Sequence, residues 1–246
     1  MTSPQDLRGR YRKREFVAVK PVLPPGSSVE DLSFEECFFS GCTFAVREGT
    51  FESPDRWARI VRLNVKDCRL SGCHLGPIIL QDAIIDGLRT DDLHVWGAVY
   101  RRVVLRGRIG PLLIGDLVVA PAGSDKETAA TCRAWTREHY ARQTDFALDL
   151  SAAEFTGEVD LRGVPARLVR RDPETQAVVR KAKVLDRRYR QLDLLGAPWD
   201  LTIDAMFDPG EDAEDRVLIA PKRDRRFKKW LEAIRILRAE GIADPD

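Results

Sequence analysis

A repeat of five residues constrains this chain more than any other feature. From Leu63 to Leu105 an apolar residue recurs at every fifth position, and another residue, apolar except at Thr90, follows each one by two positions. A helix of 3.6 residues per turn would spread both series around its surface, and a strand has a period of two. The repeat therefore predicts short stretches of strand joined by regular turns. The first series is Leu63, Cys68, Cys73, Ile78, Ala83, Leu88, Leu93, Ala98 and Val103, and the second is Val65, Leu70, Leu75, Leu80, Ile85, Thr90, Val95, Tyr100 and Leu105.

A third series supplies the turns. Two residues after each member of the second series comes a residue that is mostly a turn former: Asp67, Gly72, Pro77, Asp82, Gly87, Asp92, Gly97, Arg102 and Gly107. Four such turns would close one round of the chain in about twenty residues, and stacked rounds would pair their strands along a common axis. We therefore expect residues twenty apart to lie side by side, with both apolar series pointing into a shared core.

The units "CRLSG", "AIIDG" and "AVYRR" resemble those of the pentapeptide-repeat family, in which a small residue such as Ala or Cys stands two places before a central Leu or Phe. The resemblance covers roughly residues 30–115, with a weaker match at 150–163. It implies a short right-handed quadrilateral β-helix. We accordingly expect a mainly β fold with an inserted helix and a C-terminal α+β segment.

Two cysteine pairs have the spacing C-x4-C, Cys37 with Cys42 and Cys68 with Cys73. This spacing is compatible with a zinc site, but free cysteine also behaves as a small buried apolar residue and would fit the first series. A separation of 31 residues equals one round plus a surface loop near residues 47–57. We therefore expect Cys37 beside Cys68 and Cys42 beside Cys73, and we expect no cofactor, with these four as the candidate metal ligands.

The sequence predicts three regions. Residues 1–29 form a basic N-terminal segment. Residues 30–165 hold the repeats, interrupted by a helix over about 124–143 that begins with a capping box of Ser124 and Glu127. Residues 166–246 pack on the repeats or cap them. In this third region we expect a hairpin with its turn at 172–175, a short helix within 185–199, a strand at 216–221, and a final helix begun by Asp224 with an apolar stripe of Phe227, Trp230, Leu231, Ile234 and Leu237.

Candidate catalytic residues are few. Cys132, Glu138 and His139 lie on the expected inserted helix and include a nucleophile and a base, but no third group that would orient them is identifiable. His74 and His94 stand twenty residues apart and should stack on the outer surface. The sequence contains no metalloprotease, nucleophile-elbow, P-loop or dinucleotide-binding motif. We therefore favour a protein without enzymatic activity and keep an enzyme site near the inserted helix as an alternative.

Charge suggests a second alternative. The formal net charge is +1, so no global field attracts nucleic acid. Local basic clusters near the C-terminus would still suit nucleic-acid contacts: Arg187, Arg188, Arg190, Lys222, Arg223, Arg225, Arg226, Lys228 and Lys229. No segment has the length of a membrane helix or the apolar stretch of a secretory signal. The leading hypothesis is a bacterial, cytoplasmic scaffold that binds a protein partner and no membrane.

Overall fold

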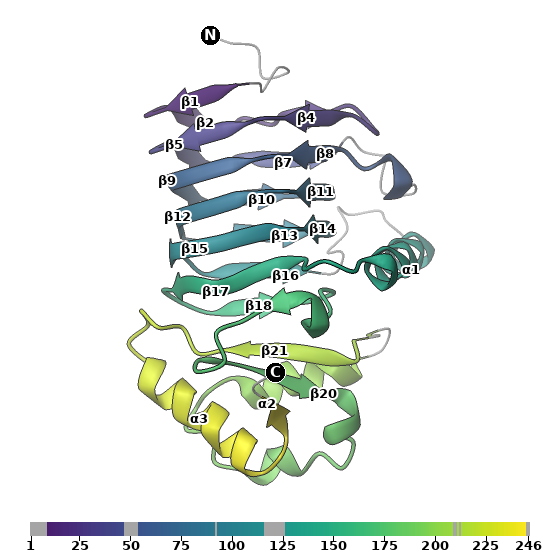
Figure 1. Cartoon of the computed structure of the whole chain (residues 1–246), viewed down its shortest axis with the longest axis vertical. Coiled ribbons are helices and arrows are strands. Elements are labelled where there is room, and N and C mark those ends of the chain that lie inside the picture. The colour runs from purple at the N-terminus through teal and green to yellow at the C-terminus, as the bar shows by residue number, and fades with distance from the viewer. Residues whose placement is uncertain are drawn as a thin grey trace.

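The computed structural model describes residues 9–46, 54–91, 93–115, 126–208, 211 and 213–244. Strand makes up 42% of the chain and helix 23%, so the protein is mainly β. Three sheets consist of parallel strands, and a fourth, near the C-terminus, is antiparallel (Figure 1). No helix in the described ranges is long and apolar enough to cross a membrane.

Successive strands along the chain belong in turn to different parallel sheets. The first sheet holds β1 (Arg10–Arg12), β2 (Glu15–Val17), β5 (Ser33–Glu35), β6 (Phe38–Ser40), β9 (Asn64–Ser71), β12 (Ile84–Thr90), β15 (Val103–Ile109), β17 (Leu148–Phe155) and β19 (Val169–Arg170). The second sheet holds β3 (Val22–Leu23), β7 (Thr43–Val46), β10 (Cys73–Leu75), β13 (Leu93–Trp96), β16 (Leu112–Gly115) and β18 (Val159–Leu161). The third holds β4 (Ser28–Glu30), β8 (Arg59–Val61), β11 (Ile78–Gln81) and β14 (Ala98–Arg101).

The register between neighbouring strands confirms the expected spacing of twenty residues. Ile79 lies beside Val99 and Ile84 beside Val104, each pair twenty apart. Both apolar series point inward: all members of the first series except the partly buried Leu63 are buried, as are most members of the second series. Members of the turn series adopt the left-handed conformation, including Asp82 at a φ of 54°.

The parallel sheets begin earlier than predicted. Residues 1–29 were expected to form a basic segment, but within this range β1 pairs with β5 and β2 pairs with β6. Tyr11 lies beside Phe34 and Phe16 beside Phe39, so the spacing of five continues to the N-terminal end. The basic residues of "RYRKREF" point outward between these aromatic side chains, and their number makes the spacing of five difficult to recognise in the sequence.

The inserted helix α1 (Lys126–Arg142) covers the outer side of the third sheet, at the right of Figure 1. Ile79 and Val99, at outward positions of β11 and β14, are consequently buried. The Tyr140 hydroxyl accepts a hydrogen bond from the backbone N–H of Tyr100, 3.1 Å away on the edge strand β14. The helix thus satisfies an amide that a further strand would otherwise bind. The proposed cap Ser124 and the loop residues 47–53 lie outside the described residues.

The antiparallel sheet contains β20 (Gln176–Arg180), β21 (Asp215–Ile219) and β22 (Ala243–Asp244). It covers the C-terminal end of the core enclosed by the parallel sheets, since Val178, Val217 and Ile219 belong to that core. The opposite side packs against α2 (Trp199–Asp204) and α3 (Phe227–Ala239) in a second core. The sheet therefore separates two hydrophobic cores.

Three expectations for this region need correction. The hairpin is wrong, because β19 pairs in parallel with β17 whereas β20 pairs with β21 and β22. The helix expected within 185–199 is a 3₁₀ turn over Arg188–Gln191, and α2 begins where it was expected to have ended. The stripe on α3 packs in the second core rather than on the repeats, with the rings of Trp199 and Trp230 5.1 Å apart. The antiparallel sheet intervenes between this helix and the repeats.

Candidate interaction surface

The cysteines lie where the spacing placed them. The Cys37 N–H is 3.4 Å from the Cys68 sulfur, and the register of β7 with β10 sets Cys42 beside Cys73. All four are buried and free of disulfides. Burial raises the pKa of Cys68 to about 11. Their thiols lie within hydrogen-bonding distance of backbone carbonyls, as Cys73 does of Phe39 O at 3.6 Å.

No metal centre is formed by the described residues: no three His, Cys, Asp or Glu side chains among them are grouped to hold an ion. The four cysteines instead occupy the first apolar series, pointing into the core.

The three candidate catalytic residues on the inserted helix differ in their exposure: Cys132 is buried, His139 is half-buried and Glu138 is exposed. Cys132 is fully buried, and burial raises the pKa of its thiol to about 11, which disfavours the nucleophilic thiolate. Glu138 and His139 instead line a surface hollow with Trp135 and Arg101, to which Cys132 does not contribute. Burial, reinforced by nearby arginines, lowers the pKa of His139.

Six of the nine candidate nucleic-acid-binding residues are engaged with acidic side chains. Arg187 and Arg190 contact Asp204, Lys222 contacts Asp172, Arg223 contacts Glu154, and the remaining two are Arg188 with Asp186 and Arg226 with Asp224. The other three, Arg225, Lys228 and Lys229, are exposed at the start of α3. Because most of the cluster is paired, its field is weaker than the sequence suggests.

Charged residues also pair along the parallel sheets. Arg12, Glu35, Lys66, Asp86 and Arg106 occupy equivalent positions on five successive strands, with alternating sign. We call them the strand ladder. Glu35 lies 3.5 Å from both Arg12 and Lys66, and Asp86 lies 2.9 Å from Arg106. Such cross-strand pairs favour the observed register.

A second ladder follows one set of turns. Asp31, Arg62, Asp82 and Arg102 succeed one another at left-handed turn positions. Arg62 contacts Asp31 at 2.7 Å and Arg102 contacts Asp82 at 2.5 Å. Hydrogen bonding from Arg102 lowers the pKa of Asp82. We call these four residues the turn ladder.

The outer side of the second sheet has a different character. The outward residues Thr43, His74, His94 and Leu113 lie in register on β7, β10, β13 and β16. The rings of His74 and His94 are 5.5 Å apart, as their spacing predicted, and the Trp96 ring lies 5.2 Å from His94. Leu113 is 42% exposed. We call these five residues the histidine face.

The five residues of the histidine face are not Asp, Glu, Lys or Arg, and the next residue in register after Leu113 is Asp160 on β18, which pairs with Arg162 at 2.8 Å. Sequence reasoning identified its two histidines but missed Trp96 and Leu113. The signal was present in the repeat, since Leu113 is apolar at an outward position that is otherwise mostly polar.

Comparison with known proteins adds no assignment: no family model matches the chain, and no curated protein matches it either.

Proposed function

We propose that the chain is a non-enzymatic scaffold of the pentapeptide-repeat type, with the parallel sheets forming a quadrilateral β-helix that binds a protein partner through the histidine face. The twenty-residue register supports this, because four units of five make one round. Left-handed turns at Asp67, Asp82 and Arg102 support it as well, since they recur where each unit should change direction.

The observation that carries the proposal is the contrast between the sides of the parallel sheets. One side is covered by α1, and another carries the charged residues of the strand ladder in ion pairs. The histidine face combines two imidazole rings, an indole and an exposed leucine on flat strands. Protein interfaces are enriched in aromatic residues and depleted of charge at their centres, which is the composition found here.

The experiment compares two matched substitutions in a pull-down from a lysate of the source organism. Leu113 and Ile84 are 42% and 40% exposed on different sides of the molecule, so Leu113→Asp and Ile84→Asp introduce the same charge with similar structural cost. We expect Leu113→Asp to reduce capture of the partner by at least about tenfold, because a charge at an interface centre is desolvated without a counter-ion.

Ile84→Asp should retain the partner at the wild-type level. Circular dichroism should show that both variants keep the wild-type spectrum. Equal capture by both variants, or equal loss from both, would contradict binding through the histidine face.

A further inference from the structure

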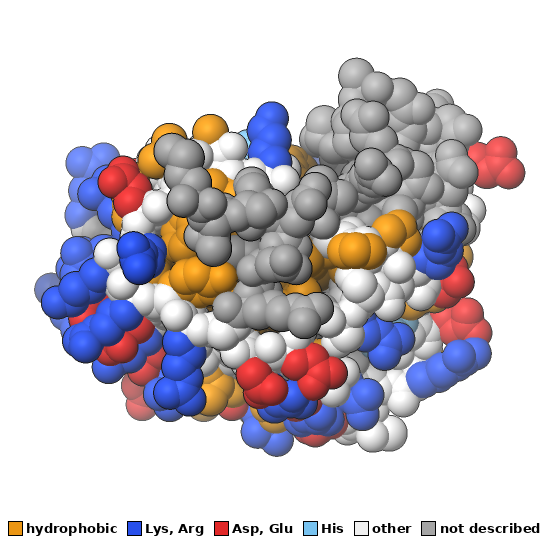
Figure 2. All heavy atoms as spheres, turned by 90° about the horizontal axis from the view of Figure 1, so that it is seen from above, with side chains coloured by type: hydrophobic (Ala, Val, Ile, Leu, Met, Phe, Trp, Pro, Cys, Tyr) orange, Lys and Arg blue, Asp and Glu red, His pale blue; other side chains and the backbone are white. Residues whose placement is uncertain are grey.

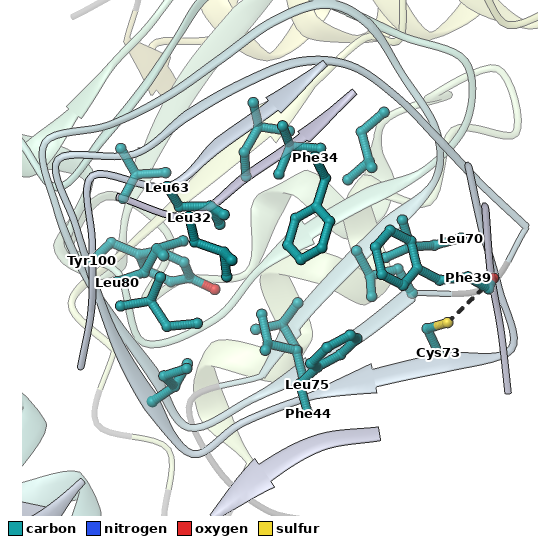
Figure 3. Close-up of a pocket in the computed structure, with 18 of the residues that line it drawn as sticks. Leu32, Phe34, Phe39, Phe44, Leu63, Leu70, Cys73, Leu75, Leu80 and Tyr100 are labelled. Atoms are coloured by element: carbon teal, nitrogen blue, oxygen red, sulfur yellow. Dashed lines mark hydrogen bonds between the residues drawn. The ribbon is translucent and has the colours of Figure 1, made fainter. Parts of the chain in front are cut away.

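The core enclosed by the parallel sheets contains a cavity of about 150 Å³ (Figure 3). Its wall is formed mainly by inward aliphatic and aromatic side chains of the second apolar series and of the first strands. The lining includes Phe39, Phe44, Leu70, Leu75, Ile85 and Tyr100. It continues to Leu23 and Val29 near the N-terminal end, where Figure 2 shows hydrophobic side chains.

The cavity follows from a change of side-chain size between successive rounds. Phe39 lies beside Leu70 and Phe44 beside Leu75, so aromatic rings in one round are followed by smaller aliphatic groups in the next. Close packing requires the lost volume to be refilled, and the backbone cannot contract because its strand spacing is fixed by hydrogen bonds. Leu70, Leu75 and Ile85 point inward and yet are only half-buried, as expected of side chains that border a void.

The hydroxyl of Tyr100 faces this mostly apolar space. Tyr100 is only 4% exposed, and its hydroxyl has no hydrogen-bond partner. The hydroxyl oxygen points into the enclosed core in Figure 3. Burial raises the pKa of Tyr100 well above its usual range, so the group keeps its proton and remains a donor. It is also the only side-chain oxygen among the described residues that line the cavity.

Water is a poor occupant of this space. A buried water usually makes about three hydrogen bonds, and apolar cavities of this volume stay dry and accept a molecule the size of benzene. The Tyr100 hydroxyl would supply one bond. The nearby Cys73 thiol already has Phe39 O within 3.6 Å.

We propose that this cavity is a binding site for a small, mostly apolar molecule that carries one hydrogen-bond acceptor, such as a cyclic ketone, with the Tyr100 hydroxyl as the donor. The apolar wall supplies affinity through burial, and the hydroxyl selects the acceptor because an unpartnered buried donor is costly. Of the five residues of the histidine face, His74 alone also lines this cavity.

The test uses cyclohexanone and methylenecyclohexane, two rings of similar shape that differ by an oxygen in place of a CH₂ group. Binding to the full chain is measured by NMR of leucine and isoleucine methyl groups, with xenon as a probe of the empty volume. Tyr100→Phe removes the hydroxyl and keeps the ring. It should weaken cyclohexanone binding about fivefold, the effect of one neutral hydrogen bond, and leave methylenecyclohexane binding unchanged or tighter.

Leu75→Phe copies the residue found in the preceding round and should abolish binding of both rings and of xenon. Leu70→Phe provides the same test if the first variant does not fold. Absence of xenon-induced shifts at Leu70, Leu75 and Ile85 in the wild type would overturn the cavity. An equal effect of Tyr100→Phe on both rings would overturn the role of the hydroxyl.

Discussion

Gly110 approaches the strand of the preceding round so closely that a side chain does not fit. A Cβ atom there would lie 2.3 Å from the backbone nitrogen of Thr90. Gly72 is favoured for a different reason, because its φ is +56° while the space around it is open. Gly110 therefore illustrates glycine selected by close approach of two strands, and Gly72 illustrates glycine selected by backbone conformation.

We expect Gly110→Ala to lower the free energy of unfolding by at least about 3 kcal/mol, because backbone must move to admit the methyl group. Gly72→Ala should cost about 1 kcal/mol, the penalty of a left-handed alanine. Urea denaturation of the two variants measures both values. Equal costs would contradict the close approach of Gly110 to Thr90 as the reason for glycine at this position.

Individual residues also show why the cysteines are poor evidence for chemistry. Their spacing is that of a metal site, yet each thiol is buried in a position that Ile78, Ala83 or Ala98 fills in other units. Burial raises the pKa of Cys68 to about 11, so the reactive thiolate is scarce near neutral pH. Packing accounts for the pattern without a ligand.

At the level of elements, the ladders couple strands that are twenty or more residues apart. The turn ladder makes stability depend on pH. Asp82 has a lowered pKa in the folded state because Arg102 donates hydrogen bonds to its carboxylate. Its contribution to stability is therefore present above the unfolded pKa of about 3.9 and is lost as the pH falls through the lower folded value.

We expect the melting temperature of the wild type to fall more steeply than that of Asp82→Asn as the pH is lowered from 5 to 3, since asparagine does not titrate. At pH 7 the variant should be the less stable protein. Thermal melts across this range measure the difference between the two. Parallel curves would mean that the Asp82 carboxyl has the same pKa in the folded and the unfolded state.

The helix α1 covers the edge of the third sheet. A helix lies beside β14 in place of a further strand. Its Tyr140 hydroxyl accepts a hydrogen bond from the Tyr100 amide, and the ring of its Trp135 lies 5.3 Å from that of Trp57. An edge strand covered in this way is protected from pairing with other chains.

At the scale of the whole molecule, the antiparallel sheet closes the C-terminal end of the main core. Val217 is buried on the side that faces this core. We expect Val217→Asp to lower the free energy of unfolding by about 4 kcal/mol, because the carboxylate would be buried without a partner. Urea denaturation and size-exclusion chromatography would detect the loss of stability and any association through the opened end.

Leu201→Asp is the control for this prediction, because Leu201 lies in the same region and is 69% exposed. It should change stability by less than about 0.5 kcal/mol. Similar losses for both substitutions would indicate that the antiparallel sheet does not depend on its contact with the main core.

The sequence predicted the parallel strands well, including the stacking of His74 on His94 and of Cys37 on Cys68. It failed at the C-terminal region, where the two arms of the expected hairpin joined different sheets. A short apolar stretch indicates a strand but does not name its partner. Here the pairing is determined by the apolar C-terminal end of the main core, because the antiparallel sheet buries it.

The sequence by itself determined which side chains point inward, because a repeat of five fixes the orientation of every residue within its own unit. Only the tertiary structure decided what the outward and inward groups meet. It placed α1 over one side, paired six of nine basic residues, left the histidine face without formal charge, and set aliphatic residues beside aromatic ones so that a cavity remained next to Tyr100. The cover by α1 and the pairing of the basic residues depend on contacts with segments outside the repeat, and the spacing of five does not specify those contacts.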